Sequence, residues 1–226
     1  MRPLGFDVYQ PDLEGIDDLG PEDGYQLRRI RTLRGPVETR LYQAPGATAG
    51  VILVGGVGGG FDSPARNLYA RLGEELAAAG IKVLRVRFRE PTHLAESIHD
   101  VLAGVALLRA HGVERVGLVG HSFGGAAVIA AGVASPVVAT VVCLATQSYG
   151  AECVGQLGPR PLLLVHGTAD EVLPPVSTTT VAANAGEPKE VVYLDGAGHV
   201  LDEAAEEVHR RTKRWLEQHL AAPAGG

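Results

Sequence analysis

VGLVGHSFGG, at residues 116–125, runs from an apolar segment into a segment of small residues. The apolar run Val116–Val119 predicts a buried parallel strand, and the small residues after Ser122 predict a helix. Between the two, Gly120 and Gly124 flank Ser122 in a G-x-S-x-G pattern. So tight a turn from strand to helix strains the serine backbone, and small neighbours are needed for the two backbones to pass. The stretch therefore predicts an α/β fold that presents a serine hydroxyl at the carboxyl edge of its sheet.

Predicted strands and helices alternate on both sides of this stretch. Besides the strand at 116–119, apolar runs predict strands at 25–33, 37–43, 51–54, 81–88, 137–144, 162–165 and 191–194. Helical spacing predicts helices at 63–79, 92–112, 122–134, from Pro174 onward and at 201–219, with Ser63 and Thr92 as N-caps. Alternation after an opening strand pair predicts a mostly parallel sheet of about eight strands, with helices on both faces.

The composition favours one globular domain. The 226 residues include 46% hydrophobic and 20% charged side chains, and this length suits a single α/β unit. Residues 1–24 hold seven acidic residues and one basic residue, so they carry the whole net charge of −6. We expect an acidic N-terminal arm at 1–24, the folded domain at 25–220 and a flexible C-terminal tail at 221–226. The charge-balanced remainder has no basic excess, which predicts no nucleic-acid partner.

Three further features of the sequence bear on the cellular location of the protein. Residues 126–146 carry no charge over a membrane-spanning length, but Ser135 and Pro136 interrupt them, so we expect a buried helix and a buried strand. The N-terminus lacks the pattern of a secretory signal. Cys143 and Cys153 lack the spacing of a metal site or a disulfide scaffold. These features predict a cytoplasmic protein with free thiols, no metal and no membrane span.

A serine hydroxyl is a poor nucleophile until a base removes its proton and a third group orients that base. Asp170 follows the predicted strand at 162–165, and His199 follows the next one at 191–194. Because the carboxyl ends of parallel strands meet at one edge of a sheet, we expect both side chains to meet Ser122 there. The chain order Ser, Asp, His is also the one expected after such a turn. We predict Ser122 as nucleophile, His199 as base and Asp170 as the orienting acid.

Other residues compete for these roles. Glu171 and Asp195 are alternative orienting acids, and Ser122 could be only a helix N-cap, a role that needs no flanking glycines. His166 ends its strand beside a glycine, which is typical of a residue that supports a loop. The weaker candidate bases are the histidines on predicted helices, His93, His99, His111, His209 and His219.

A second glycine-rich segment, GGVGGG at residues 55–60, follows the predicted strand at 51–54. Acyl transfer needs N–H donors aimed at the oxygen that becomes negative, and glycines let a backbone approach a substrate closely. We expect the N–H groups of Phe123 and Val57 to form this oxyanion hole. The alternative is a phosphate-binding loop, but the Lys-Ser/Thr pair of that motif is missing from this segment.

Together these residues resemble the α/β-hydrolase superfamily over about residues 25–220. LLLVHGTADEVLPP, at 162–175, is similar to the acid loop of the compact dienelactone-hydrolase-like and acyl-peptidase-like serine esterases, and DGAGH, at 195–199, to their histidine loop. The chain departs from these relatives in two places. Dienelactone hydrolases proper use cysteine where this chain has Ser122, and many relatives carry His-Gly where this chain has Gly55-Gly56.

The resemblance implies hydrolysis of a small-molecule carboxylic ester through an acyl-enzyme on Ser122, with no cofactor. A thioesterase or acyltransferase with the same residues is the alternative, and a catalytically silent binding protein is a further one. Residues 145–159 leave little room for the lid that the family often inserts, which predicts an open cleft and small or extended substrates. The candidate substrate-binding residues are Gly56, His121, Tyr149 and Leu173, with Phe61, Gln147 and Val200 as further candidates for the cleft wall.

Arg85, Arg87 and Arg89 alternate with apolar residues and share one face of a predicted strand. A solvated strand face is the simplest interpretation. A sharper hypothesis is that the acidic arm folds over these arginines, or over Arg29 and Arg31. Alternatively, Arg89 could meet an anionic substrate.

Overall fold

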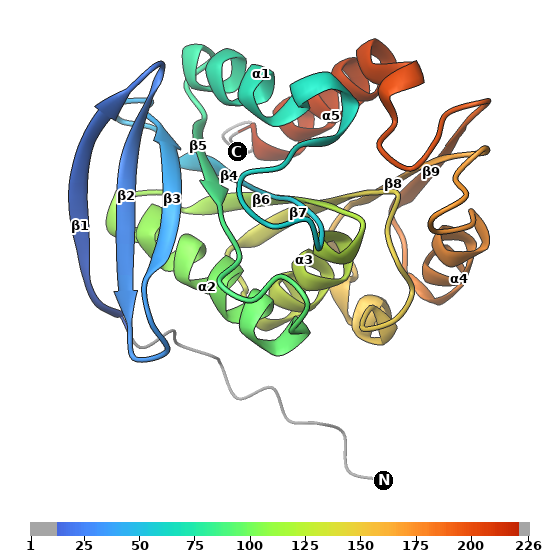
Figure 1. Ribbon diagram of the computed structural model, residues 1–226, viewed down its shortest axis with the longest axis horizontal. Coiled ribbons are helices and arrows are strands. Elements are labelled where there is room, and N and C mark those ends of the chain that lie inside the picture. The colour runs from blue at the N-terminus through green and yellow to red at the C-terminus, as the bar shows by residue number, and fades with distance from the viewer. Residues whose placement is uncertain (1–12, 222–226) are drawn as a thin grey trace, which may run out of the picture.

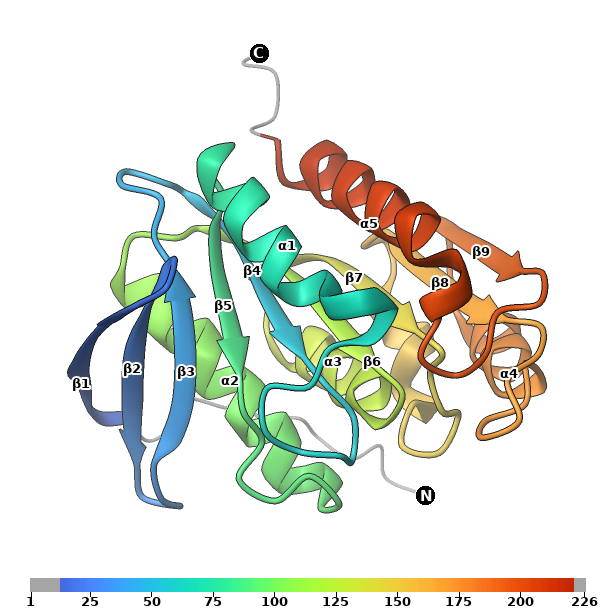
Figure 2. The same ribbon diagram turned by 45° about the horizontal axis from the view of Figure 1, so that its top comes forward.

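The computed structural model describes residues 13–221 and shows a central sheet between two layers of helices (Figure 1, Figure 2). The strands are β1 (Leu13–Glu22), β2 (Tyr25–Thr32), β3 (Val37–Tyr42), β4 (Ala49–Val54), β5 (Lys82–Val86), β6 (Arg115–His121), β7 (Val138–Leu144), β8 (Leu162–Gly167) and β9 (Lys189–Leu194). The helices are α1 (Pro64–Ala78), α2 (Leu94–Ala110), α3 (Phe123–Ala134), α4 (Val176–Asn184) and α5 (Ala205–Leu220), with the short 3-10 helices η1 (Glu152–Leu157) and η2 (Asp202–Ala204).

The sheet has nine strands in the order β1-β2-β3-β5-β4-β6-β7-β8-β9. The pairs β1–β2, β2–β3 and β3–β5 are antiparallel, and every pair from β5 to β9 is parallel. The predicted mostly parallel sheet with an antiparallel start is confirmed, and the predicted number of about eight strands is one too few. Parallel pairing brings the carboxyl ends of β4, β6, β8 and β9 to one edge, where the loops that follow them can meet.

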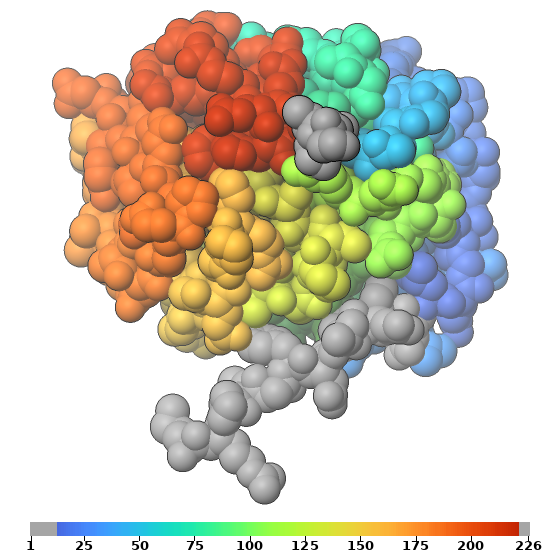
Figure 3. All heavy atoms as spheres, turned by 180° about the vertical axis from the view of Figure 1, so that it is seen from behind, coloured from blue at the N-terminus to red at the C-terminus, as the bar shows by residue number. Residues whose placement is uncertain are grey.

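Two apolar cores lie on the two faces of the sheet. Helices α1 and α5 cover one face, and α2, α3 and α4 cover the other (Figure 1). Along β4, Ile52 and Val54 face the core under α2 and α3, whereas Val51 and Leu53 face the core under α1 and α5. Burial on both faces explains why the central strands are continuous apolar runs in the sequence. Seen from behind, β1 and the α4–β9 segment lie at opposite sides of the molecule (Figure 3).

The additional strand, β1, comes from the segment predicted as an acidic arm. Residues 13–22 pair antiparallel with β2, and residues 1–12 lie outside the described part of the chain. Residues 13–22 of the expected acidic arm are therefore an edge strand of the sheet. Opposite charges support the pairing, because Asp17 Oδ1 lies 3.2 Å from Arg31 Nε and Asp18 forms an ion pair with Arg28. Of the two arginines in the hypothesis, Arg31 meets the acidic segment, whereas Arg29 lies 2.9 Å from Glu38 of β3.

Removal of β1 is expected to destabilise the domain. Ile16 packs against the core under α2 and α3, and without β1 the backbone groups of β2 lie unpaired at the sheet edge. We expect deletion of residues 1–22 to lower the melting temperature by roughly 5 °C, since about 1 kcal/mol corresponds to about 2–4 °C at this chain length. Ile16→Ala should reproduce part of the loss, whereas Leu19→Ala should not, because Leu19 is 44% exposed. A melting curve that the deletion leaves unchanged would contradict a stabilising role for β1.

The two predicted N-caps have different outcomes, because Ser63 precedes α1 as expected and Thr92 does not cap α2. The N-cap of α2 is His93, whose Nδ1 accepts a hydrogen bond from the Glu96 N–H at 3.4 Å, so the prediction of Thr92 is wrong. At the start of α1, the backbone of residues 65–67 is left-handed, and the helix is regular only after this kink. Ser63 Oγ accepts from the Tyr69 N–H at 2.8 Å, so the serine caps the regular part of the helix and not its first turn.

The uncharged stretch at 126–146 forms most of α3 and all of β7, both largely buried within the domain. This matches the expected helix and strand. In residues 13–221, no helix combines the length and the apolar character needed to cross a membrane.

Candidate active site

Ser122 lies in the turn between β6 and α3. Its φ of 56° and ψ of −120° fall outside the regions that non-glycine residues favour, a strain of about 1–3 kcal/mol. A Cβ on Gly120 would lie 2.2 Å from the Gly124 carbonyl oxygen, and a Cβ on Gly124 would lie 2.2 Å from the Gly55 carbonyl oxygen. Only glycine fits at either position, because both obstacles are backbone atoms. The strained turn expected from the sequence is therefore present.

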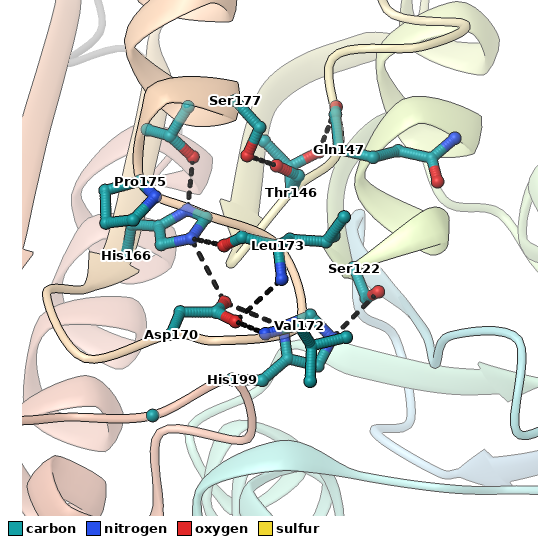
Figure 4. Close-up of polar contacts among 12 residues, drawn as sticks. Ser122, Thr146, Gln147, His166, Asp170, Val172, Leu173, Pro175, Ser177 and His199 are labelled. Carbon is teal, nitrogen blue, oxygen red and sulfur yellow. Dashed lines mark hydrogen bonds and ion pairs between the residues drawn. The ribbon is translucent and has the colours of Figure 1, made fainter.

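The structure brings Ser122, His199 and Asp170 into contact (Figure 4). Ser122 Oγ lies 3.0 Å from His199 Nε2, and His199 Nδ1 lies 2.7 Å from Asp170 Oδ2. Asp170 follows the carboxyl end of β8 and His199 follows that of β9. When Nδ1 donates its proton to Asp170, Nε2 is free to accept the proton of the Ser122 hydroxyl. The arrangement has the geometry by which a base activates a serine hydroxyl.

The Asp170 carboxylate is buried, and donors surround both of its oxygens. Oδ1 accepts from the N–H groups of Val172 at 2.9 Å and Leu173 at 2.8 Å, and Oδ2 accepts from His199. Burial by itself raises the pKa of Asp170, but the hydrogen bonds from His199, Leu173 and Val172 outweigh burial and leave this pKa below its usual range. Asp170 is therefore ionised at neutral pH, as a group that orients a base requires.

The competing acids and the second strand-end histidine make other contacts. Asp195 accepts a hydrogen bond from the Thr168 hydroxyl at 3.2 Å, and Glu171 is exposed. His166 is fully buried, with Nδ1 2.7 Å from the hydroxyl of Thr178 on α4. His166 thus supports the loop after β8, which agrees with its expected role.

His121, which was a candidate for substrate binding, is buried beside the candidate base. Its Nε2 lies 2.9 Å from the His199 carbonyl oxygen, and the two rings are 4.9 Å apart between centroids. Burial lowers the pKa of His121 to about 4, so the ring is neutral at pH 7 and Nε2 can donate to that carbonyl. The contact assigns His121 to the support of the His199 backbone.

The glycine-rich loop after β4 passes beside Ser122. A Cβ on Gly56 would lie 3.3 Å from the Ser122 Cβ, so the loop and the turn are in close contact. Val57 comes next and is exposed. Phe123 is the first residue of α3, and its N–H therefore has no acceptor within the helix. Both residues are close to Ser122, and their role as an oxyanion hole stays a prediction.

Asp62 is a residue of this loop region that the sequence did not single out. Its Oδ2 accepts from the Gly56 N–H at 3.1 Å, and burial raises the pKa of its carboxyl group. The buried Arg85 donates to the Phe61 carbonyl oxygen, and the Arg40 guanidinium lies 4.2 Å from the centroid of the Phe61 ring. These contacts hold the glycine-rich loop against the sheet. In the sequence, a lone acid after a glycine run was too weak a signal.

Loss of the Asp62 carboxylate is expected to slow catalysis. Asp62→Ala removes the acceptor that holds Gly56, and we expect kcat to fall about 10-fold, less than the loss of a whole oxyanion donor. Asp62→Asn keeps an acceptor oxygen and should retain most of the rate. Both variants can be assayed with p-nitrophenyl acetate, with melting curves to check their folding. Equal kcat values for the wild type and the alanine variant would contradict this role.

The three arginines predicted on one strand face have three different surroundings. Arg85 is buried, Arg87 lies 3.7 Å from Glu38 of β3, and Arg89 Nε lies 2.5 Å from the buried Asp100 of α2. Because β5 ends before Arg87, the three do not share a strand face. The interpretation as a solvated strand face is therefore wrong. These partners come from β3 and α2, not from the acidic segment, and Arg89 is already paired with a buried carboxylate.

Exposed apolar side chains lie on the segments next to Ser122, Asp170 and His199. They are Val57 on the glycine-rich loop, Tyr149 after β7, Val172 after Asp170, Val176 at the start of α4 and Val200 after His199. Leu173 is half-buried, and the Phe61 ring lies against the Arg40 guanidinium. Gln147 donates from its side chain to the Tyr149 carbonyl oxygen at 2.7 Å.

The segment between β7 and β8 contains no helical lid. Within these described residues the helical part is η1, whose Val154 and Leu157 are buried in the core under α3. The expectation of a minimal lid is confirmed.

The fold is similar to that of several solved hydrolase structures. Est1E from Butyrivibrio proteoclasticus has a TM-score of 0.72 at 17% identity, over 87% of this chain and 99% of that one. An α/β serine hydrolase homologue from Coxiella burnetii has a TM-score of 0.72 at 21% identity, over 88% and 98%. A dienelactone hydrolase from Anabaena variabilis has a TM-score of 0.73 at 19% identity, over 94% and 100%.

No model of a known protein family matches the chain, and neither does the sequence of any curated protein. The similarity is therefore one of fold, which the similar structures share over almost their whole length. This chain has the α/β-hydrolase fold.

Proposed function

We propose that this chain is a serine hydrolase that cleaves carboxylic esters through an acyl-enzyme on Ser122. The observation that carries the proposal is the line of contacts from Ser122 Oγ to His199 at 3.0 Å and from His199 to the ionised Asp170 at 2.7 Å. The strained turn supports it, because a plain helix cap needs neither the strain nor the two glycines. An esterase domain from a Rhodothermus marinus protein and the serine hydrolase homologue from Coxiella burnetii, both similar in fold, agree with this reaction class.

The reaction follows from these contacts in two halves. Ser122 Oγ attacks the acyl carbon while His199 Nε2 takes the hydroxyl proton, and Asp170 stabilises the imidazolium that forms. Collapse of the tetrahedral intermediate breaks the ester C–O bond, and His199 returns the proton to the leaving alcohol. Water then gives a proton to His199 and attacks the acyl carbon. Ser122 leaves with that proton, so one ester and one water yield one acid and one alcohol.

The N–H groups of Phe123 and Val57 are proposed to stabilise the negative oxygen in both halves. The N-terminus of α3 adds its dipole at the same point. Gly56, held by Asp62, keeps the loop close to Ser122.

The surroundings of Ser122 favour small or extended ester substrates. The segments next to the site carry the exposed apolar side chains of Val57, Tyr149, Val172, Val176 and Val200. Because no helical lid lies between β7 and β8, nothing in that segment encloses a long acyl chain. Contact of an acyl group with these side chains would remove apolar surface from water and favour binding.

A fluorophosphonate probe combined with an ester panel tests the proposal. We expect the probe to label Ser122, as identified by peptide mass spectrometry, and p-nitrophenyl esters of short acyl chains to be hydrolysed. His199→Ala should abolish both labelling and hydrolysis. Absence of labelling in the folded wild-type chain would reject Ser122 as nucleophile. Acyl thioesters of the same chain lengths belong in the panel, since a preference for them would favour the thioesterase alternative.

A further inference from the structure

His166 is a buried polar side chain in direct contact with the site, and the reaction proposed above does not use it. It lies at the end of β8 and is fully buried. Its Nδ1 lies 2.7 Å from Thr178 Oγ1, and its Nε2 lies 2.8 Å from the Leu173 carbonyl oxygen and 3.1 Å from Asp170 Oδ2. Figure 4 shows the ring between α4 and the loop that carries Asp170. Both ring nitrogens therefore have partners.

The partners decide which nitrogen carries the proton. Nε2 faces two oxygens that can only accept, the Leu173 carbonyl and the Asp170 carboxylate, so Nε2 holds the proton and donates to Leu173. In the neutral ring, Nδ1 then accepts from the Thr178 hydroxyl. The proton-bearing edge of the ring consequently lies against Asp170 Oδ2. The same oxygen accepts the hydrogen bond from His199.

We propose that His166 is a positioning residue that holds Asp170 in the orientation in which it serves His199, an inference that rests on the proposed function of Ser122. The ring acts on both carboxylate oxygens. It lies directly against Oδ2, and it holds the carbonyl of Leu173, whose own N–H donates to Oδ1 at 2.8 Å. Thr178 on α4 fixes the other end of the ring. Asp170 is thereby tied to β8 and α4 through one side chain.

The contact between His166 and Asp170 also affects the electrostatic interaction between Asp170 and His199. The N–H edge of His166 draws electron density from Oδ2, which weakens the attraction of that oxygen for a protonated His199. Loss of His166 removes this donor and also loosens Asp170, so the pH dependence of the reaction reports on the contact. The other groups that face the pair are the neutral His121 from β6 and the N–H groups of Val172 and Leu173.

Two amide replacements separate this role from simple packing. In His166→Gln the amide nitrogen lies the same number of bonds from Cα as Nε2, so it can donate to Leu173 and face Asp170. In His166→Asn the amide nitrogen corresponds to Nδ1, so it reaches Thr178 and not Asp170. We expect the asparagine variant to lose about 10- to 100-fold in kcat with KM nearly unchanged. The acidic limb of its kcat/KM profile should move away from that of the wild type, and the glutamine variant should recover most of both the rate and the profile.

Two further variants distinguish the possible outcomes. His209→Asn replaces another buried histidine, on α5 beside Glu75, and should leave the pH profile as in the wild type. Thr178→Val keeps the size of the side chain but frees Nδ1, so it should shift the profile in the same direction to a smaller extent. It also carries the test if the asparagine variant does not fold.

Equal losses of kcat in the asparagine and glutamine variants, with the acidic limb of the kcat/KM profile unmoved, would overturn the inference. If the asparagine variant does not fold, a kcat/KM profile of Thr178→Val identical to that of the wild type would overturn it. Failure of the proposed function is a separate result, because the wild-type chain itself would then neither label with the fluorophosphonate nor hydrolyse esters.

Discussion

The Ser122→Ala variant is expected to hydrolyse p-nitrophenyl esters on the order of 10⁶-fold more slowly than the wild-type chain, measured as kcat. The alanine has no oxygen to attack the acyl carbon, so no acyl-enzyme forms and only attack by water remains. KM should change little, since the loop next to Ser122 and its exposed apolar side chains are intact. Labelling by a fluorophosphonate should disappear with the hydroxyl.

Ser135→Ala is the matched control for this variant. Ser135 and Ser122 are both 8% exposed and lie at the two ends of α3. Removal of the Ser135 hydroxyl should leave both kcat and labelling at the wild-type level. Ester hydrolysis at the wild-type rate by Ser122→Ala would mean that another group is the nucleophile.

Asp170→Asn is expected to lower kcat by about 10⁴-fold while the fold is retained. The asparagine oxygen can still accept from the N–H groups of Val172 and Leu173, which leaves its amide NH₂ facing His199 Nδ1. Two donors cannot share a hydrogen bond, so the His199 proton moves to Nε2. In that tautomer Nε2 no longer accepts the Ser122 proton, and the base is lost although every side chain stays in place.

The neighbouring acids provide the controls for this substitution. Glu171→Gln and Asp195→Asn change the two acids that the sequence left as alternatives, and neither should alter kcat by more than about 2-fold, as expected for side chains outside the reacting groups. A melting curve of Asp170→Asn close to that of the wild type is part of the expected result. A large loss in Asp195→Asn together with an active Asp170→Asn would reverse the assignment of the acid.

Local sequence patterns predicted much of this architecture. The apolar runs identified the central strands, because a parallel strand covered on both faces has almost no polar positions. The glycines around Ser122 predicted the strained turn. The backbone atoms that exclude a Cβ there belong to the same few residues or to the neighbouring loop after β4. Asp170 and His199 were selected by their positions after consecutive strands, and the structure brings both to Ser122.

The acidic strand β1 shows why other features could not be predicted. The β1–β2 pairing is interrupted by bulges between Leu13 and Gly15 and between Asp18 and Gly20. The residues of β1 therefore show no regular apolar alternation that would identify a strand in the sequence. It exists as a strand because β2 offers an unpaired edge and basic partners such as Arg31. A strand propensity that depends on the partner strand cannot be predicted from the sequence of the segment alone.

By itself, the sequence determined the α/β order of elements, the turn at Ser122 and the strand ends that carry Asp170 and His199, because each of these depends on short-range patterns. Only the tertiary structure decided what holds those residues in place. Asp62 reaches Gly56 at 3.1 Å, and His166 lies between Asp170 and Thr178. These are contacts of single side chains, set by how loops and helices pack and not by any periodic pattern. A buried polar group must find its partners wherever the fold places them, and no local spacing records where that is.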